Sequence, residues 1–197
     1  MDTREVFILT VAWISAVGTT AVVGQVPRFE RENLRFTVVN DSCLVEGEYV
    51  FRNSGADSLF GSVVYPFPSA PDLPLPATVD VSRGDGTFLS LRVPADGQAL
   101  SLPVSIAPWG VKRYGVRYRQ GTPAKRMEYI LTSTQTWGTP LAEADVVVMI
   151  PAHARLLSTT LPFDSCAVVD TMTRFYAHRV NFYPGSNLVF TWREMSR

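Results

Sequence analysis

The chain has 197 residues, 46% of them hydrophobic, which is enough to build a sizeable core as one domain or at most two small ones. Its 14 prolines and 13 glycines disfavour long helices. The 18 basic and 18 acidic residues cancel, so there is no net positive charge to attract nucleic acid, and we expect no nucleic-acid partner.

Residues 6–24, near the amino terminus, are apolar and carry no charged side chain. The pattern predicts a signal peptide over residues 1–24. An uncleaved signal-anchor helix is the alternative, because Asp2 and Glu5 offset Arg4 in the flank that precedes the apolar run. Both interpretations place the rest of the chain outside the cytoplasm, in the periplasm, the cell envelope or the medium. Membrane contact is then expected only through the N-terminal segment.

The folded domain is predicted over residues 34–197. Residues 25–33, which precede it, have mixed charge and include a proline, so we expect an exposed connector there. Within the domain, residues 43–68 alternate as a half-buried β-hairpin does, with Cys43, Val45, Tyr49 and Phe51 on one parity of its first strand. A two-stranded hairpin needs another layer to cover its apolar face, so the rest of the chain should supply a second sheet.

Further strands are predicted between turns rich in glycine, proline and asparagine. Five prolines within residues 66–76 predict an extended crossover that leaves the sheet. Besides a first strand at 34–39, the expected strands lie at residues 78–82, 87–93, 100–106, 112–120, 127–132, 144–150, 156–162, around Cys166, 173–182 and 188–192. These elements predict an all-β fold, an antiparallel two-sheet β-sandwich of roughly nine to eleven strands.

The two cysteines of the chain fit an oxidising compartment. Cys43 and Cys166 form a candidate disulfide, and the alternative is a pair of buried free thiols. The two histidines, His153 and His178, add no close ligand pair, so we expect neither a metal site nor a cofactor.

Basic side chains are concentrated on one predicted strand, where Arg113, Arg117 and Arg119 share the parity opposite to its tyrosines. This pattern is compatible with a face for a polyanionic glycan, lipid headgroups or an acidic partner. We favour the alternative, a solvated outer face opposite the glutamates of the hairpin. Trp109 and Trp137 lie in corners that contain proline and glycine, and are candidate binding residues, either as a sugar platform or as packing plugs.

The sequence assigns no catalytic residue. It has no G-x-S-x-G motif, phosphate loop or dinucleotide fingerprint. A hydrolase would need His153 or His178 beside an acid and a hydroxyl in a pocket. A carbohydrate-binding module would need two of Trp109, Trp137 and Trp192 side by side in an exposed cleft.

Several short motifs occur in a fixed order along the chain. They are G-x-Y-x-F-x-N at residues 47–53, an aromatic-proline exit at 65–68, Y-x-V-x-Y-x-Q at 114–120, W-G-x-P-L at 137–141 and N-F-x-P-x-x-x-L-x-F-x-W at 181–192. The set resembles exported bacterial β-sandwich domains of unknown function. The first two motifs are also distantly similar to the N-terminal domain of vault and inter-alpha-trypsin inhibitor proteins. The resemblance implies a shared fold and carries over no catalytic residue.

These observations together predict an extracytoplasmic structural or protein-interaction module, without catalytic activity, that meets a protein or envelope partner. The first alternative is a carbohydrate-binding module with a glycan ligand. The second alternative is a hydrolase of unknown substrate.

Overall fold

The computed structural model describes residues 26–68, 70–82, 84, 87–94 and 99–195, together with the backbone of Trp13 and Ile14. The described chain is mostly strand, with one 3-10 helix. In chain order, the elements are β1 (Trp13–Ile14), β2 (Arg28–Val39), β3 (Ser42–Arg52), β4 (Leu59–Pro66), β5 (Thr78–Ser82), β6 (Phe88–Arg92), β7 (Ala99–Ile106), β8 (Val111–Gly121), β9 (Arg126–Tyr129), η1 (Thr132–Trp137), β10 (Leu141–Pro151), β11 (Ala154–Thr159), β12 (Ser165–Val169), β13 (Met172–Phe182) and β14 (Leu188–Glu194).

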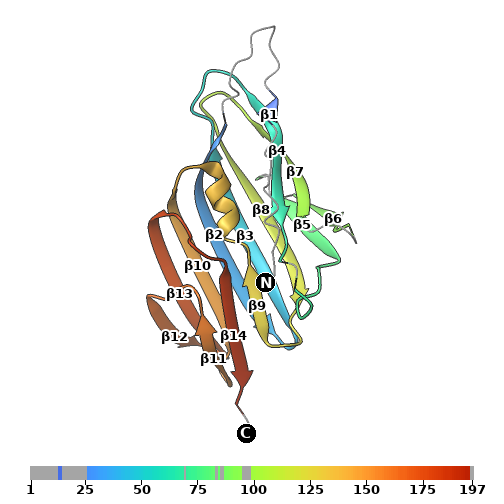
Figure 1. The fold of residues 1–197 in the computed structure, drawn as a ribbon, viewed down its shortest axis with the longest axis vertical. Helices are drawn as coiled ribbons and strands as arrows, with labels where there is room; N and C mark the ends of the chain where they lie inside the picture. Colours follow the sequence, from blue (N-terminus) through green and yellow to red (C-terminus); the bar gives the residue numbers. More distant parts are fainter. Residues whose placement is uncertain are drawn as a thin grey trace, which may run out of the picture.

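The strands form one large sheet and two small ones. The large sheet has eight strands in the order β12-β13-β10-β2-β3-β8-β5-β6, and the small sheets are β1-β4-β7 and β11-β14-β9. Neighbouring strands are antiparallel except for β10 and β2, which run parallel. In Figure 1, β4 and β7 lie toward the top of the molecule and β9, β11 and β14 toward the bottom.

Both small sheets cover the same face of the large sheet. One parity of the central strands of the large sheet is buried, as in β2, where Leu34, Phe36 and Val38 are each at most 3% exposed. The Phe36 ring packs against Phe190 of β14, and the Tyr118 ring of β8 packs against Tyr65 of β4. Aromatic contacts therefore join the large sheet to each of the small ones, and the opposite face of the large sheet is left to solvent.

The expected all-β class is confirmed, with a second layer that is divided between two sheets and with more strands than expected. The inward residues predicted for the hairpin, Cys43, Val45, Tyr49 and Phe51, are all buried. The predicted leader, residues 1–24, lies outside the described residues apart from the backbone of β1. Among the residues that the structure describes, no helix is long and apolar enough to cross a membrane.

The first long strand starts earlier than the sequence predicts. β2 begins at Arg28, so residues 28–33 are strand and not the exposed connector that we expected. Its register with β3 shifts between Phe29 and Arg31, which is the signature of a β-bulge. The bulge changes the parity of the strand, so that both Phe29 and Glu32 point into the core although their positions differ by an odd number, three.

The predicted disulfide between Cys43 and Cys166 is wrong. Both are free cysteines, and Cys43 is buried whereas Cys166 is exposed. Cys43 lies on β3 and Cys166 on β12, with three strands between them in the large sheet. Strands in a sheet are about 4.8 Å apart, so the two thiols lie well beyond the roughly 7 Å that a bridge can span between Cα atoms. The alternative, two buried thiols, holds for Cys43 alone.

Native protein should therefore react with a maleimide at Cys166 and not at Cys43, because burial blocks access to Cys43 and raises the pKa of its thiol. Intact-mass spectrometry should show a single adduct under native conditions and a second one in denaturant. Cys166→Ser should abolish native labelling, and Cys43→Ser should leave it in place. A chain that takes up maleimide only after reduction would contradict this assignment.

Candidate functional site

A pocket lies where the two small sheets meet over β2 and β3. It has a volume of about 50 Å³ and is lined by residues from β2, β3, β4, β7, β8, β9 and η1. Most of its lining side chains are aromatic or aliphatic. The lining residues of η1 and several of β4 keep some solvent exposure, so the pocket opens between these two elements. We call it the seam pocket.

Glu32 is the one acidic residue among the described residues that line the seam pocket. It lies on β2 in the same parity as Leu34 and Phe36, and its side chain is buried, with the residue only 2% exposed. One carboxyl oxygen, Oε1, is 3.1 Å from the hydroxyl of Tyr129. The other oxygen, Oε2, is buried and has no hydrogen-bond partner. Burial raises the pKa of Glu32 to about 7, and the hydrogen bond with Tyr129 opposes this shift.

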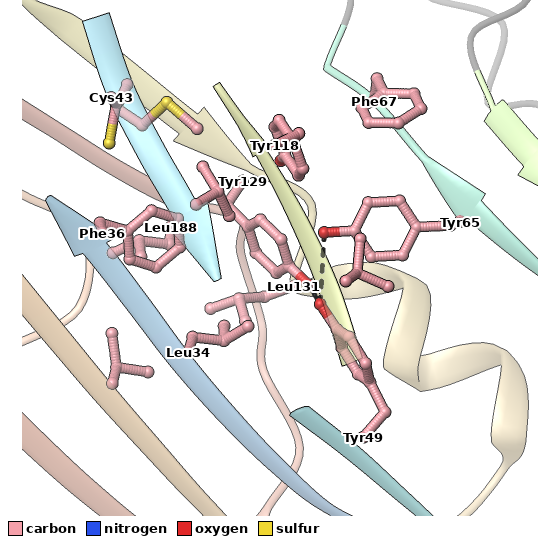
Figure 2. Close-up of a cluster of buried hydrophobic side chains, with 14 of the residues drawn as sticks. Leu34, Phe36, Cys43, Tyr49, Tyr65, Phe67, Tyr118, Tyr129, Leu131 and Leu188 are labelled. Carbon is pink, nitrogen blue, oxygen red and sulfur yellow. Dashed lines mark hydrogen bonds between the residues drawn. The ribbon is translucent and has the colours of Figure 1, made fainter. Parts of the chain in front are cut away.

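Three tyrosine hydroxyls meet beside Glu32, one from each sheet. The hydroxyl of Tyr49 on β3 is 2.8 Å from that of Tyr129 on β9 and 3.2 Å from that of Tyr65 on β4. Figure 2 shows the three rings turned so that their hydroxyl groups point toward one another. Burial raises the pKa of all three hydroxyls well above the ordinary value, so they stay protonated. The polar cluster therefore ties the three sheets together at the point where the second layer is divided.

The hydrogen bonds of this cluster depend on the charge of Glu32, because each hydroxyl has only one proton to donate. With Glu32 ionised, Tyr129 donates to Oε1 and Tyr49 donates to Tyr129. With Glu32 protonated, the directions reverse and Tyr49 donates to Tyr65. The protonation of Glu32 thus decides whether the Tyr49 hydroxyl donates to Tyr129 or to Tyr65.

Gly47 makes the position of Tyr49 possible. A Cβ atom on Gly47 would lie 2.1 Å from the hydroxyl oxygen of Tyr49 and 2.6 Å from its Cζ atom. The Tyr49 ring therefore lies back along β3 over a residue without a side chain, and this brings its hydroxyl to Tyr129. The glycine of the G-x-Y-x-F-x-N motif has a direct role in the geometry of the pocket.

Aromatic rings line the part of the pocket that lies next to η1. The rings of Phe29 and Phe51 stack with centroids 4.9 Å apart, and the half-buried Trp137 lies 5.3 Å from Phe51. Trp137 thus packs against the core and also lines the pocket. Trp109 lies in the turn after β7 and is 67% exposed, while Trp192 is buried in the core. Of Trp109, Trp137 and Trp192, only the first two are accessible to a ligand.

The three predicted arginines lie on the outer face of β8, away from the seam pocket. Nη1 of Arg113 is 3.1 Å from Oε1 of Glu48. Nη2 of Arg117 is 3.5 Å from Oδ2 of Asp80. Arg119 donates to the hydroxyl of Ser42. Two of the three arginines thus face carboxylates of neighbouring strands.

Neither histidine lines the seam pocket. His178 lies on the exposed face of β13, with Nδ1 2.9 Å from Oδ1 of Asp145, and Tyr176 donates to the same oxygen at 2.6 Å. His153 lies in the exposed turn between β10 and β11. In the part of the chain that is described, no group of three His, Cys, Asp or Glu side chains could hold a metal ion.

A scan against protein-family models finds no match, and a comparison with curated proteins finds no similar sequence. Among solved structures, the chain is similar to a protein of Legionella pneumophila that is provisionally described as a nutrient binding protein, with a TM-score of 0.68 and 14% identity over 84% of this chain and 66% of that one. It is also similar to an M1 zinc metallopeptidase of Deinococcus radiodurans, with a TM-score of 0.50 and 13% identity over 84% of this chain and 42% of that one.

The chain spans less than two thirds of the length of either protein. At these identities the likeness shows the fold alone, a β-rich domain. The similarity to vault and inter-alpha-trypsin inhibitor proteins that the motifs predict has no support from these comparisons.

Proposed function

We propose that this domain is a non-catalytic interaction module of the cell exterior that holds one group of a partner molecule in the seam pocket. The observation that carries the proposal is that Glu32, whose buried Oε2 has no hydrogen-bond partner, lines a pocket together with several aromatic rings. A buried polar atom without a partner costs about 1–3 kcal/mol, and a ligand that supplies the missing hydrogen bond recovers that cost. Buried, convergent polar groups in an apolar pocket are typical of binding sites.

The chemistry of the pocket favours binding over catalysis. Tyr49, Tyr65 and Tyr129 each contribute a hydroxyl group to it. The raised pKa values of these three hydroxyls keep them from acting as nucleophiles near neutral pH. Each of these hydroxyls is already hydrogen-bonded within the cluster. The provisional description of the L. pneumophila protein also concerns binding.

The size of the pocket limits what enters it. A water molecule needs about 10–15 Å³ of such space, and pockets for drug-sized ligands measure roughly 300–1,000 Å³. At about 50 Å³, the seam pocket takes one small group. We therefore propose a protein or envelope partner that inserts one side chain or head group and makes its other contacts on the surface around η1 and β4.

The extracytoplasmic location is part of the same proposal. It rests on the uncharged apolar run of residues 6–24. Fusing residues 1–33 to alkaline phosphatase, which is active only after export, tests it.

The binding proposal can be tested with four-carbon probes that fit a narrow pocket. NMR titrations of the labelled protein with n-butylamine, n-butanol and butyrate should show shifts of the Trp137 indole signal with at least one probe. Val63 packs against the core and lines the pocket from β4, so Val63→Phe should fill it and abolish these shifts. Val168→Phe, on the exposed edge strand β12, is the matched control. The absence of any saturable shift with all three probes would contradict the proposed function.

A further inference from the structure

The unpartnered oxygen of Glu32 defines the first requirement for a ligand. A carboxylate offers about four acceptor positions, and Tyr129 occupies only one of them. The Tyr49 and Tyr129 hydroxyls have their protons committed within the cluster. No neighbouring protein group donates a hydrogen bond to Oε2. A ligand group that binds there therefore has to be a hydrogen-bond donor.

The charge of the pocket defines the second requirement. Among the residues that the structure describes, no arginine, lysine or histidine lines it, so an ionised Glu32 has no counter-ion from this part of the chain. An anionic ligand group would meet a buried carboxylate without any compensating cation. A cation would instead pair with Glu32 and lie among aromatic rings such as Tyr49, Tyr65 and Trp137, whose faces attract positive charge.

The shape of the pocket selects among cations. An ammonium group is compact and has three donors, whereas a guanidinium group is planar and has five. Oε2 of Glu32 and the lone pairs of the tyrosine oxygens are few acceptors, so a guanidinium would leave buried donors unpaired. Val63, Leu102 and Val104 also line the pocket and offer an apolar surface to a short alkyl stem.

We propose that the group bound in the seam pocket is the ammonium head of a primary alkylamine, with Glu32 as its counter-ion and the tyrosine cluster as its further acceptors. This inference rests on the proposed function and adds the ligand chemistry to it. A free alkylamine and the lysine side chain of a partner polypeptide both carry this group.

Binding of an ammonium group should depend on pH through Glu32. The titratable groups that face Glu32 across the pocket are Tyr49 on β3, Tyr65 on β4, Tyr114 on β8 and Tyr129 on β9. Within the described part of the chain, Glu32 is the only charged side chain that lines the pocket. Because the pKa of Glu32 is about 7, the ionised form that pairs with a cation is scarce at pH 6 and predominates at pH 8. The affinity for n-butylamine, which stays protonated over this range, should rise about tenfold between these pH values.

The test compares n-butylamine, n-butanol and butyrate by NMR titration at pH 8. We expect n-butylamine to bind at least about tenfold more tightly than n-butanol, since it adds the charge pairing with Glu32. Butyrate should not bind. Glu32→Gln should remove the preference for n-butylamine over n-butanol, whereas Glu46→Gln, on the outer face of β3, should keep that preference. The pH series with the wild-type protein tests the same inference without any substitution.

Each outcome separates this inference from the function on which it rests. If n-butanol binds as well as n-butylamine, or if Glu32→Gln keeps the preference for the amine, the ammonium assignment is wrong while the binding function stands. If none of the probes binds, both are wrong. A titration with Nα-acetyl-lysine N-methylamide identifies the source of the amine: tighter binding than n-butylamine indicates a lysine of a polypeptide, and weaker binding indicates a free alkylamine.

Discussion

Replacing Glu32 with glutamine should remove a pH-dependent loss of stability that the wild-type protein shows between about pH 4.5 and pH 7. Burial raises the pKa of Glu32 from 4.5 to about 7 in the folded state. Between these values the folded protein holds a proton that the unfolded chain has released. The free energy of unfolding must therefore fall as the pH rises, because folding takes up a proton. At about 1.4 kcal/mol per pH unit, the loss amounts to about 3 kcal/mol by pH 7.5.

Denaturant unfolding at several pH values from 4.5 to 8 measures this effect. The free energy of unfolding of Glu32→Gln, minus that of the wild type, should increase by about 3 kcal/mol over this range, because glutamine has no proton to lose. Glu46→Gln is the matched control, since it removes a carboxylate from the outer face of the neighbouring strand and should follow the wild-type curve. Parallel curves for Glu32→Gln and the wild type would show that Glu32 is solvated in the folded state.

The alternation of side chains was sufficient to predict the core of the central hairpin. Cys43, Val45, Tyr49 and Phe51 share one parity, and all four are buried. This succeeds because successive side chains of a strand point to opposite faces, so a half-buried strand records its orientation in its own sequence. Parity does not say which strands become neighbours. The pairing of Cys43 with Cys166 failed for that reason, since both lie on strands but the sheet order separates them.

The seam pocket could not be predicted in the same way. Glu32 shares the parity of Leu34 and Phe36, and this was the one signal in the sequence that placed a carboxyl in the core. The β-bulge near Arg31 concealed it, because Phe29 then points inward from the opposite parity and the segment reads as exposed and charged. The contact between Tyr49 and Tyr129 joins residues 80 positions apart, and no local pattern encodes such a meeting.

Phe36→Ala should lower the free energy of unfolding by about 3–5 kcal/mol, because it opens a cavity between the large sheet and the sheet β11-β14-β9. Phe36 is 0% exposed, and its ring centroid lies 5.5 Å from that of Tyr129 and 5.8 Å from that of Phe190. Equilibrium denaturation in guanidinium measures the loss, and Phe36→Leu, with a smaller volume change, keeps the comparison measurable if the alanine variant does not fold. A loss below about 1 kcal/mol would mean that β9 and β14 do not cover β2.

Phe60→Ala is the control for this substitution, since Phe60 is 53% exposed on β4 and its removal should change the stability by no more than about 0.5 kcal/mol.

The Phe36 variants also test how the core supports the pocket. Phe36 packs edge-on against Tyr129, and Tyr129 holds Oε1 of Glu32. A smaller residue at position 36 should loosen Tyr129 and admit water to the carboxyl, which lowers the pKa of Glu32 because burial is what raises it. In Phe36→Leu, the pH-dependent loss of stability that Glu32 causes should therefore be smaller than in the wild type.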